Sequence, residues 1–304
     1  MLDQESRTRS PSQKDLVRVY QYKKCYTGLV SKPYPAVERI SFGLDDGECF
    51  ALLGVNGAGK STVFKSLTND VVPTSGEISI RGVNAVKDFS KVRRWMGYCP
   101  QHDAIFGLMT VDEHLQLYAR VKSISVDRRD QVIEDAIEKL NLVEHRSKLA
   151  KNLSGGNKRK LSVAIALLGN PKIILLDEPS SGMDPEARRF MWQLIEKISI
   201  RDKRSTVILT THSMEEAEAL STKMAIMTRG SKGGTFSCFG SSQHIKNKFA
   251  TGYEIEIKIK KIPDAEKNQF KNESGLQGSM NERISLEKAI AILRRSNVDG
   301  LILD

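Results

Sequence analysis

Apolar and polar residues follow two different periodicities along this chain. Short continuous or alternating apolar runs predict strands, and apolar residues at helical spacing predict amphipathic helices. The predicted strands cover residues 16–20, 36–42, 49–53, 77–80, 95–99, 172–176, 206–210 and 223–228, and the predicted helices cover 62–68, 111–149, 158–168, 185–199 and 213–220. Strands that alternate with helices indicate βαβ units and a largely parallel sheet, so the predicted fold class is α/β.

The pattern changes toward both ends of the chain. Residues 1–14 combine Ser, Arg and Gln with a proline, and we predict that they are disordered. Residues 15–248 form the α/β region, in which the helical stretch at about 102–170 indicates an inserted helical subdomain. Residues 254–260 alternate strictly and residues 284–293 have helical periodicity, so we expect residues 249–304 to be a partial α+β extension. Residues 21–34 are polar and predict a loop, which holds Tyr22, Tyr26 and Tyr34.

The segment from Gly54 to Thr62 fits the pattern of a phosphate-binding loop, G-x-x-x-x-G-K-[ST], between a predicted strand and a predicted helix. Glycines let the backbone approach a ligand closely, so that the loop and the helix N-terminus direct N–H groups at an anion. Lys60 is expected to reach the β- and γ-phosphates, and the Ser61 hydroxyl is expected to ligate Mg²⁺. The predicted nucleotide-binding residues of this loop are Gly54, Asn56, Gly57, Ala58, Gly59, Lys60, Ser61 and Thr62.

Other candidate residues follow predicted strands or begin predicted helices. Asp177 ends an apolar strand and suits the Mg²⁺ shell, while Glu178 is the better candidate to orient and polarise an attacking water. The segment Ser154, Gly155, Gly156 and Asn157 begins a helix and forms either a second anion site or an ordinary helix cap. Taken singly, Gln101, His212 and Asp184 are compatible with loop or capping roles.

Together and in this order, these motifs resemble the nucleotide-binding domain of ATP-binding cassette (ABC) proteins, over about residues 16–245. The sequence Leu-Ser-Gly-Gly-Asn before a basic helix is similar to the family signature, although Asn157 stands where Gln is usual. The segments at 54–61, 96–101, 154–162, 182–189 and 212–220 resemble the A subfamily of eukaryotic ABC transporters, many of which move lipids. The resemblance implies a P-loop NTPase cassette with a mixed sheet core, an antiparallel β subdomain and an inserted helical subdomain. The region after residue 253 resembles the start of a regulatory domain.

The resemblance also implies roles for the candidate residues. Lys60, Gln101, Glu178 and His212 would be catalytic, and Ser61, Gln101 and Asp177 would hold Mg²⁺. The signature residues Ser154, Gly155, Gly156 and Asn157 would act in trans on the ATP of a second cassette, with Asp184 at the interface between cassettes. Tyr20 would stack on adenine, with Tyr22 and Tyr26 as alternatives.

Several partners are implied in the same way. They are a second cassette, in the same chain or a homodimer, the transmembrane domains of a transporter and, indirectly, a lipid substrate. Phe106 and Leu108, in the loop at 103–108, suit a contact with a membrane-domain helix, and a loop anchored in the core is the alternative. No apolar run here is long enough to span a bilayer, so we expect either a fragment of a larger transporter or a separate subunit. The resemblance implies that this cassette lies at the cytoplasmic face of a membrane.

Composition and charge exclude few classes of protein or partner. Hydrophobic residues make up 39% of the chain and charged residues 28%, which is ordinary for a globular protein. The net charge of +10 permits an anionic membrane surface or a soluble ABC ATPase that acts on ribosomes or nucleic acid. Nucleic acid is the less expected partner. In the family that this chain resembles, members that act on ribosomes carry two cassettes in one chain and DNA-repair members have a long coiled-coil insertion, and this sequence shows neither feature. The four cysteines, Cys25, Cys49, Cys99 and Cys238, form no C-x-x-C pair, so we expect free thiols and no zinc site.

Overall fold

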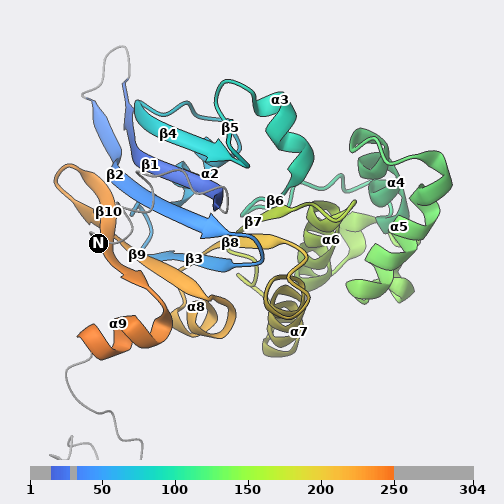
Figure 1. Ribbon diagram of the computed structural model, residues 1–304. Helices are drawn as coiled ribbons and strands as arrows, with labels where there is room; N and C mark the ends of the chain where they lie inside the picture. Colours follow the sequence, from blue (N-terminus) through green and yellow to red (C-terminus); the bar gives the residue numbers. More distant parts are fainter. Residues whose placement is uncertain (1–14, 28–32, 250–304) are drawn as a thin grey trace, which may run out of the picture. The chain divides into compact units, whose positions relative to one another are not determined.

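The computed structural model describes residues 15–27 and 33–249 of the chain (Figure 1). The predictions for residues 1–14 and 250–304 lie outside these residues. Within them, one ten-stranded sheet carries helices on both faces. The alternation of strands and helices predicted from the sequence is confirmed.

The strands and helices have the following bounds. The strands are β1 Asp15–Tyr26, β2 Tyr34–Asp45, β3 Cys49–Gly54, β4 Ser75–Ile80, β5 Val83–Asn84, β6 Met96–Cys99, β7 Ile173–Asp177, β8 Thr206–Thr211, β9 Lys223–Gly230 and β10 Gly233–Gly240. The helices are α2 Lys60–Leu67, α3 Phe89–Val92, α4 Val111–Val121, α5 Val126–Lys139, α6 Gly155–Leu167, α7 Pro185–Glu196, α8 Met214–Leu220 and α9 Ser242–Phe249. A π-helical turn, Lys197–Arg201, follows α7.

The sheet is mixed, in the order β5-β4-β1-β2-β10-β9-β3-β8-β7-β6. Strands β9, β3, β8, β7 and β6 pair in parallel with one another in that order. Strand β1 pairs antiparallel with β2 and β4, and β4 pairs antiparallel with β5. Strand β10 joins the two parts, antiparallel to β9 and parallel to β2. The parallel part holds the strands that carry the predicted motifs. Because parallel strands end at one edge, β3, β7 and β8 bring their carboxyl ends close together.

Two buried apolar clusters cover the faces of the central strands. In β3, Phe50 and Leu52 belong to one cluster, and Cys49, Ala51 and Leu53 belong to the other. Strand side chains point alternately to opposite faces, so a strand covered on both faces is a continuous apolar run. This explains why β3, β7 and β8 were recognisable from the sequence.

The predicted loop at 21–34 is wrong for its first part, because β1 continues to Tyr26 and pairs with both β2 and β4. Register shifts and a positive φ of 45° at Gln21 interrupt the alternation there. The side chain of Tyr22 is fully buried, and its hydroxyl hydrogen-bonds Ser66 Oγ at 2.7 Å. Burial raises the pKa of Tyr22 to about 12. Strands β5 and β10 and helices α3 and α9 were not predicted.

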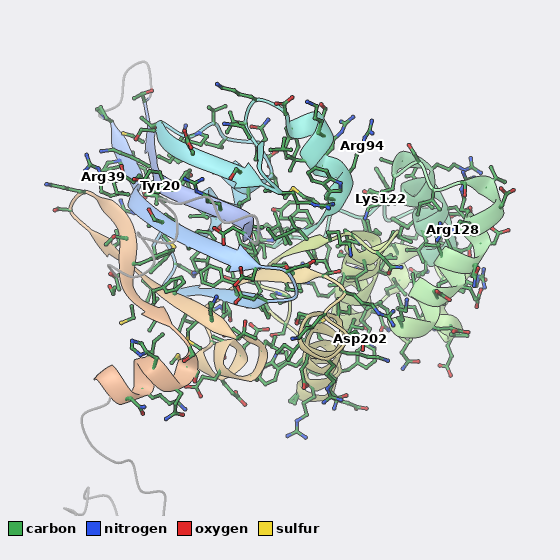
Figure 2. All side chains as sticks on the ribbon, viewed as in Figure 1. Tyr20, Arg39, Arg94, Lys122, Arg128 and Asp202 are labelled. Atoms are coloured by element: carbon green, nitrogen blue, oxygen red, sulfur yellow. The ribbon has the colours of Figure 1, made fainter. Side chains whose placement is uncertain are left out.

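Helices α4, α5 and α6 form a helical part at one end of the sheet (Figure 1). Thr110 and Glu113 cap α4 with reciprocal side-chain to backbone hydrogen bonds, which satisfy N–H groups that a helix start leaves free. At the other end of α4, Lys122 Nζ donates to the carbonyls of Ile165, Ala166 and Leu168 at 2.9–3.0 Å (labelled in Figure 2). Lys122 therefore ties α4 to the end of α6.

Among the residues that the structure describes, no helix has the length and apolar character needed to cross a membrane. All four cysteines are free, and Cys49 and Cys99 are buried. Burial raises the pKa of each of these two thiols to about 12.

Candidate nucleotide-binding and catalytic site

The predicted phosphate-binding loop joins β3 to the N-terminus of α2. Lys60, the first residue of α2, is buried, and its Nζ donates to the carbonyls of Gly54 at 2.6 Å and Val55 at 3.3 Å. The N–H groups of Thr62 and Val63 donate to Gly59 O at 3.1 Å. The loop thus curls around the Lys60 side chain, and the first turn of α2 starts directly from it.

Two loop positions require glycine. Gly59 has φ of 108°, and a Cβ there would lie 2.8 Å from Ala36 O. A Cβ on Gly54 would lie 2.4 Å from Met227 O. Such approaches are closer than any side chain allows, so neighbouring strands fix the path of the loop.

A cavity of about 280 Å³ lies over the loop. Its lining includes eight of the predicted site residues, Asn56, Gly57, Gly59, Lys60, Ser61, Thr62, Gln101 and Glu178, together with Tyr34 and Ala36. The ends of β6 and β7 therefore bring Gln101 and Glu178 to the phosphate-binding loop from distant parts of the sequence. Gly54, Ala58, Asp177 and His212 do not line this cavity.

The carboxyl end of β7 holds the two acidic candidates in different environments. Asp177 is buried, and its Oδ1 accepts a hydrogen bond from Thr210 Oγ1. Glu178 has a positive φ of 50°, and its N–H donates to Thr210 Oγ1 and Thr210 O at 3.0 and 3.1 Å. Its Oε2 lies 3.6 Å from Nδ1 of the exposed His212. Thr210, which the sequence interpretation did not single out, thus orients both acidic residues.

Burial shifts the pKa values of two charged groups of the site in opposite directions. It lowers the pKa of Lys60, against the raising influence of Glu178 and Asp177. It raises the pKa of Asp177, against the lowering influence of the Thr210 hydrogen bond. Each group loses hydration on burial, which disfavours its charged form. A ligand that carries both a cation and negative phosphates would offset this cost for both groups.

The signature-like segment begins α6 outside the cavity. Ser154 is the N-cap of α6, and its Oγ accepts the N–H of Asn157 at 3.3 Å. Ser154 and Gly155 are exposed. Asp184 caps α7 through the Ala187 N–H at 2.9 Å, and that hydrogen bond lowers the pKa of Asp184. A Cβ on Gly156 would lie 3.8 Å from Asp184 Oδ2, so the starts of α6 and α7 lie side by side.

One buried side chain of α6, which no sequence pattern marks, contacts the backbone beside the site. The Arg159 guanidinium donates to backbone carbonyls at the ends of both β6 and β7. This set of contacts became visible only in three dimensions.

The aromatic candidates for adenine lie at different places. Tyr34 lines the cavity, and its ring centre lies 6.5 Å from that of Tyr26. Arg229 lies against the Tyr34 ring, 4.6 Å from its centre, and donates to its hydroxyl. Tyr20, labelled in Figure 2, does not line the cavity, and Tyr22 is fully buried.

Two exposed apolar side chains follow the Gln101 segment. Phe106 is 54% exposed and Leu108 is 76% exposed. The adjoining backbone is ordered, because the Phe106 N–H donates to Nε2 of the buried His114 at 2.9 Å. The loop is therefore anchored while these two side chains face outward.

A larger cavity, of about 410 Å³, lies among α5, α7 and the turn after α6. Its lining is mainly apolar, and it includes none of the predicted site residues. Size alone therefore does not identify the site, whereas convergent polar groups do.

Comparisons with known proteins agree with the motifs. A family model described as ABC transporter matches residues 37–181. The human retinal-specific phospholipid-transporting ATPase ABCA4 is 49% identical over 250 residues, which are 82% of this chain and 11% of that protein. Human ATP-binding cassette sub-family A member 2 is 48% identical over 252 residues, 83% of this chain and 10% of that protein.

A solved structure shows the same fold. It is the dimeric post-hydrolysis state of the ATP-binding cassette MJ0796 bound to ADP and Pi. The TM-score is 0.66 at 23% identity, with 74% of this chain and 98% of that chain covered. The predicted fold class is confirmed.

The chain belongs to the ABC transporter family and is an ATP-binding cassette. Within that family it resembles members of the A subfamily, at close to half of the aligned positions. The chain spans about a tenth of the length of the curated relatives that it matches.

Proposed function

We propose that this chain binds and hydrolyses ATP, and that hydrolysis requires a second cassette. The observation that carries the proposal is the single cavity lined by the phosphate-binding loop, Gln101 and Glu178. Phosphoryl transfer to water needs a loop that can hold phosphates, oxygen donors for Mg²⁺ beside the phosphates, and a carboxylate that can accept a proton. The loop, Gln101 and Glu178 can supply these groups.

The residues present fit ATP with Mg²⁺. Ser61, Gln101 and Asp177 offer oxygen donors, which Mg²⁺ prefers, and the pKa shifts of Lys60 and Asp177 fit a site completed by charged ligands. Bound Mg²⁺ would neutralise phosphate charge. Lys60 would exchange its carbonyl contacts for phosphate oxygens, while the N–H groups of the loop hold the remaining oxygens.

Glu178 would accept a proton from the attacking water. Its backbone N–H is fixed by Thr210, so its carboxylate approaches the cavity from a defined direction, as general-base catalysis requires. His212, 3.6 Å from Glu178, would orient that carboxylate or hydrogen-bond the γ-phosphate. Tyr34, with Tyr26 beside it, is better placed than Tyr20 to hold the adenine ring.

The signature-like segment would complete the site of a partner cassette. Ser154 and Gly155 are exposed at a helix start, and Asp184 lies beside the adjacent Gly156. N–H groups at a helix N-terminus favour an anion. The dimeric state of MJ0796 supports two cassettes facing each other, each covering the phosphates bound by the other.

The relatives suggest what this hydrolysis serves. Because ABCA4 is named a phospholipid-transporting ATPase, we propose that the cassette drives lipid transport through transmembrane domains, at the cytoplasmic face of a membrane. Phe106 and Leu108 are the proposed contacts for those domains. The relatives favour this function over a soluble ATPase acting on ribosomes or nucleic acid.

The test compares the parent chain with Glu178→Gln in ATP and Mg²⁺, with phosphate release and particle mass measured together. We expect the parent to hydrolyse ATP at a rate that rises more than linearly with protein concentration. The variant should lose at least about 100-fold in hydrolysis, the scale of a general base, and accumulate as an ATP-bound dimer. Glu138→Gln, at an exposed position of α5, is the matched control. Parent protein that binds ATP without turnover at any concentration would refute hydrolysis by this chain.

A further inference from the structure

Arg159 has an unusual set of partners for a buried cation. It is almost inaccessible to solvent. Its guanidinium donates to five backbone carbonyls and one carboxylate, namely those of Pro100, Gln101, Asp177, Glu178, Pro179 and Asp103. A guanidinium has five N–H donors in a rigid plane, so every donor can be occupied.

These carbonyls belong to two strand ends that meet at the proposed ATP site. Those of Pro100 and Gln101 follow β6, that of Asp177 ends β7, and that of Glu178 comes directly after it. Gln101 and Glu178 both line the cavity over the phosphate-binding loop. The side chain of Arg159 therefore holds the backbone of both cavity residues from behind.

Arg159 itself lies on the helix that begins with the signature-like segment. It follows Ser154 by five residues, which corresponds to about 8 Å along a helix axis. Lys122 holds the far end of the same helix through three carbonyls. Since α6 is fixed at both places, a shift of the two strand ends must move the start of α6 or strain the Arg159 contacts.

Asp103 and Ser162 complete the arrangement. Asp103 Oδ1 accepts from Arg159 at 3.3 Å and from Ser162 Oγ at 2.9 Å. Asp103 is partly exposed and lies just after Gln101. It is the only carboxylate paired with Arg159 within the described part of the chain, so it adds both charge balance and a second link to α6.

We propose that Arg159 is a positioning residue that couples nucleotide at the chain's own phosphate-binding loop to the signature-like segment, residues 154–157. Nucleotide contacts displace the Gln101 and Glu178 backbones, and Arg159 transmits that displacement to α6. The segment that acts on the partner's ATP is then presented only when the chain's own site is filled. The inference rests on the proposed ATP site. It adds the contacts through which nucleotide at that site affects the signature-like segment.

The test measures amide hydrogen exchange of residues 154–160 with and without ATP and Mg²⁺, in a Glu178→Gln background so that ATP persists. The protein is diluted until particle mass shows single cassettes with ATP bound, so that contacts in a dimer do not protect these amides. In that background, ATP should slow exchange by about 5- to 150-fold, the usual size of coupling between sites. Arg159→Lys should reduce the effect to less than about twofold while ATP affinity changes by less than about threefold. Arg146→Lys, whose guanidinium pairs with Asp112 and Glu134 at the surface, is the matched control.

Asp103→Asn provides a second variant that leaves the carbonyl contacts in place. It should retain the fold and ATP affinity and show an intermediate slowing of exchange. The coupling role is wrong if both variants keep the full ATP-dependent slowing, or if exchange along all of α6 rises without ATP, which would indicate packing alone. Absence of ATP binding in the background protein would instead refute the proposed function.

Discussion

The two glycine-rich segments of this cassette have similar composition but opposite surroundings. In the phosphate-binding loop, a Cβ on Gly54 or Gly59 would collide with backbone of a neighbouring strand. In the signature-like segment, a Cβ on Gly155 would meet nothing within 4 Å. Gly155 also has no positive φ that would favour glycine. The fold itself thus requires the glycines of the first segment but not Gly155.

This difference indicates where each segment works. A loop shaped by its own chain can bind phosphate without a partner, because its N–H groups are already in place. A glycine that no contact in its own chain requires makes sense when another molecule approaches it closely. The comparison therefore supports a composite site from the steric surroundings of these glycines, independently of the MJ0796 dimer.

The largest effect is expected for Gly59→Ala. A Cβ 2.8 Å from Ala36 O at φ of 108° should lower the free energy of unfolding by about 3 kcal/mol or more, since strain and overpacking add. ATP affinity should be lost together with stability. Gly82→Ala is the control, because Gly82 also has positive φ but open space around a Cβ, and it should cost only about 1 kcal/mol. Urea unfolding measures both, and equal costs would contradict the steric argument.

Gly155→Ala should affect activity and not stability. The free energy of unfolding should stay within about 0.5 kcal/mol of the parent, as for unconstrained surface sites. Phosphate release should fall about 100-fold, the scale of losing one donor to a developing charge, while ATP affinity of the single cassette is kept. Gly230→Ala, where there is also room for a Cβ, should change neither the free energy of unfolding nor the rate of phosphate release. Unchanged phosphate release in Gly155→Ala would mean that nothing approaches Gly155 during hydrolysis.

The same contrast explains what could be predicted from the sequence. Roles carried by contiguous residues, such as the loop from Gly54 to Thr62, follow from local chemistry and spacing. Arg159 and Thr210 act on residues 18 to 59 and 32 to 33 positions away, so no local pattern marks them. The extension of β1 to Tyr26 was missed because bulges break its alternation, and β10 was missed because five of its eight residues are Gly, Thr or Ser.

Tyr34 was named only as a loop residue for a related reason. It sits 20 positions before Gly54 in the sequence, and the pairing of β2 with β10 links this strand to the part of the sheet that holds the phosphate-binding loop. By contrast, Glu178 follows an apolar strand whose end at the sheet edge could be anticipated. Residues at strand ends were therefore predictable, and residues placed by strand pairing were not.

An intermediate effect is expected at Tyr34. Tyr34→Ala should weaken ATP binding about tenfold, as expected for loss of one base–aromatic stack, and Tyr34→Phe should retain affinity. Tyr20→Ala should change affinity by less than about twofold, because Tyr20 lies outside the cavity lining. Titration with a fluorescent ATP analogue measures all three variants. A larger loss for Tyr20→Ala than for Tyr34→Ala would restore Tyr20 as the adenine contact.

The smallest effect is expected for the pH dependence of stability that comes from Lys122, which holds the C-terminal end of α6. Burial lowers the pKa of Lys122 to about 8 from its usual 10.5. In the unfolded chain Lys122 keeps its proton to higher pH, so folded protein should gain about 1 kcal/mol between about pH 7 and pH 9. Lys122→Met should lack this gain.

The comparison of the two proteins isolates Lys122 from other titrating groups. The raised pKa values of Tyr22, Tyr98, Cys49 and Cys99 act in the opposite direction above about pH 9, since the unfolded chain then loses protons first. Both proteins share these groups, so the difference between their urea midpoints reports Lys122 alone. A difference that does not vary with pH would show that the three carbonyls and the dipole of α6 hold the charged ammonium and offset its burial. Lys122 would then fix the far end of α6 at every pH at which the cassette works.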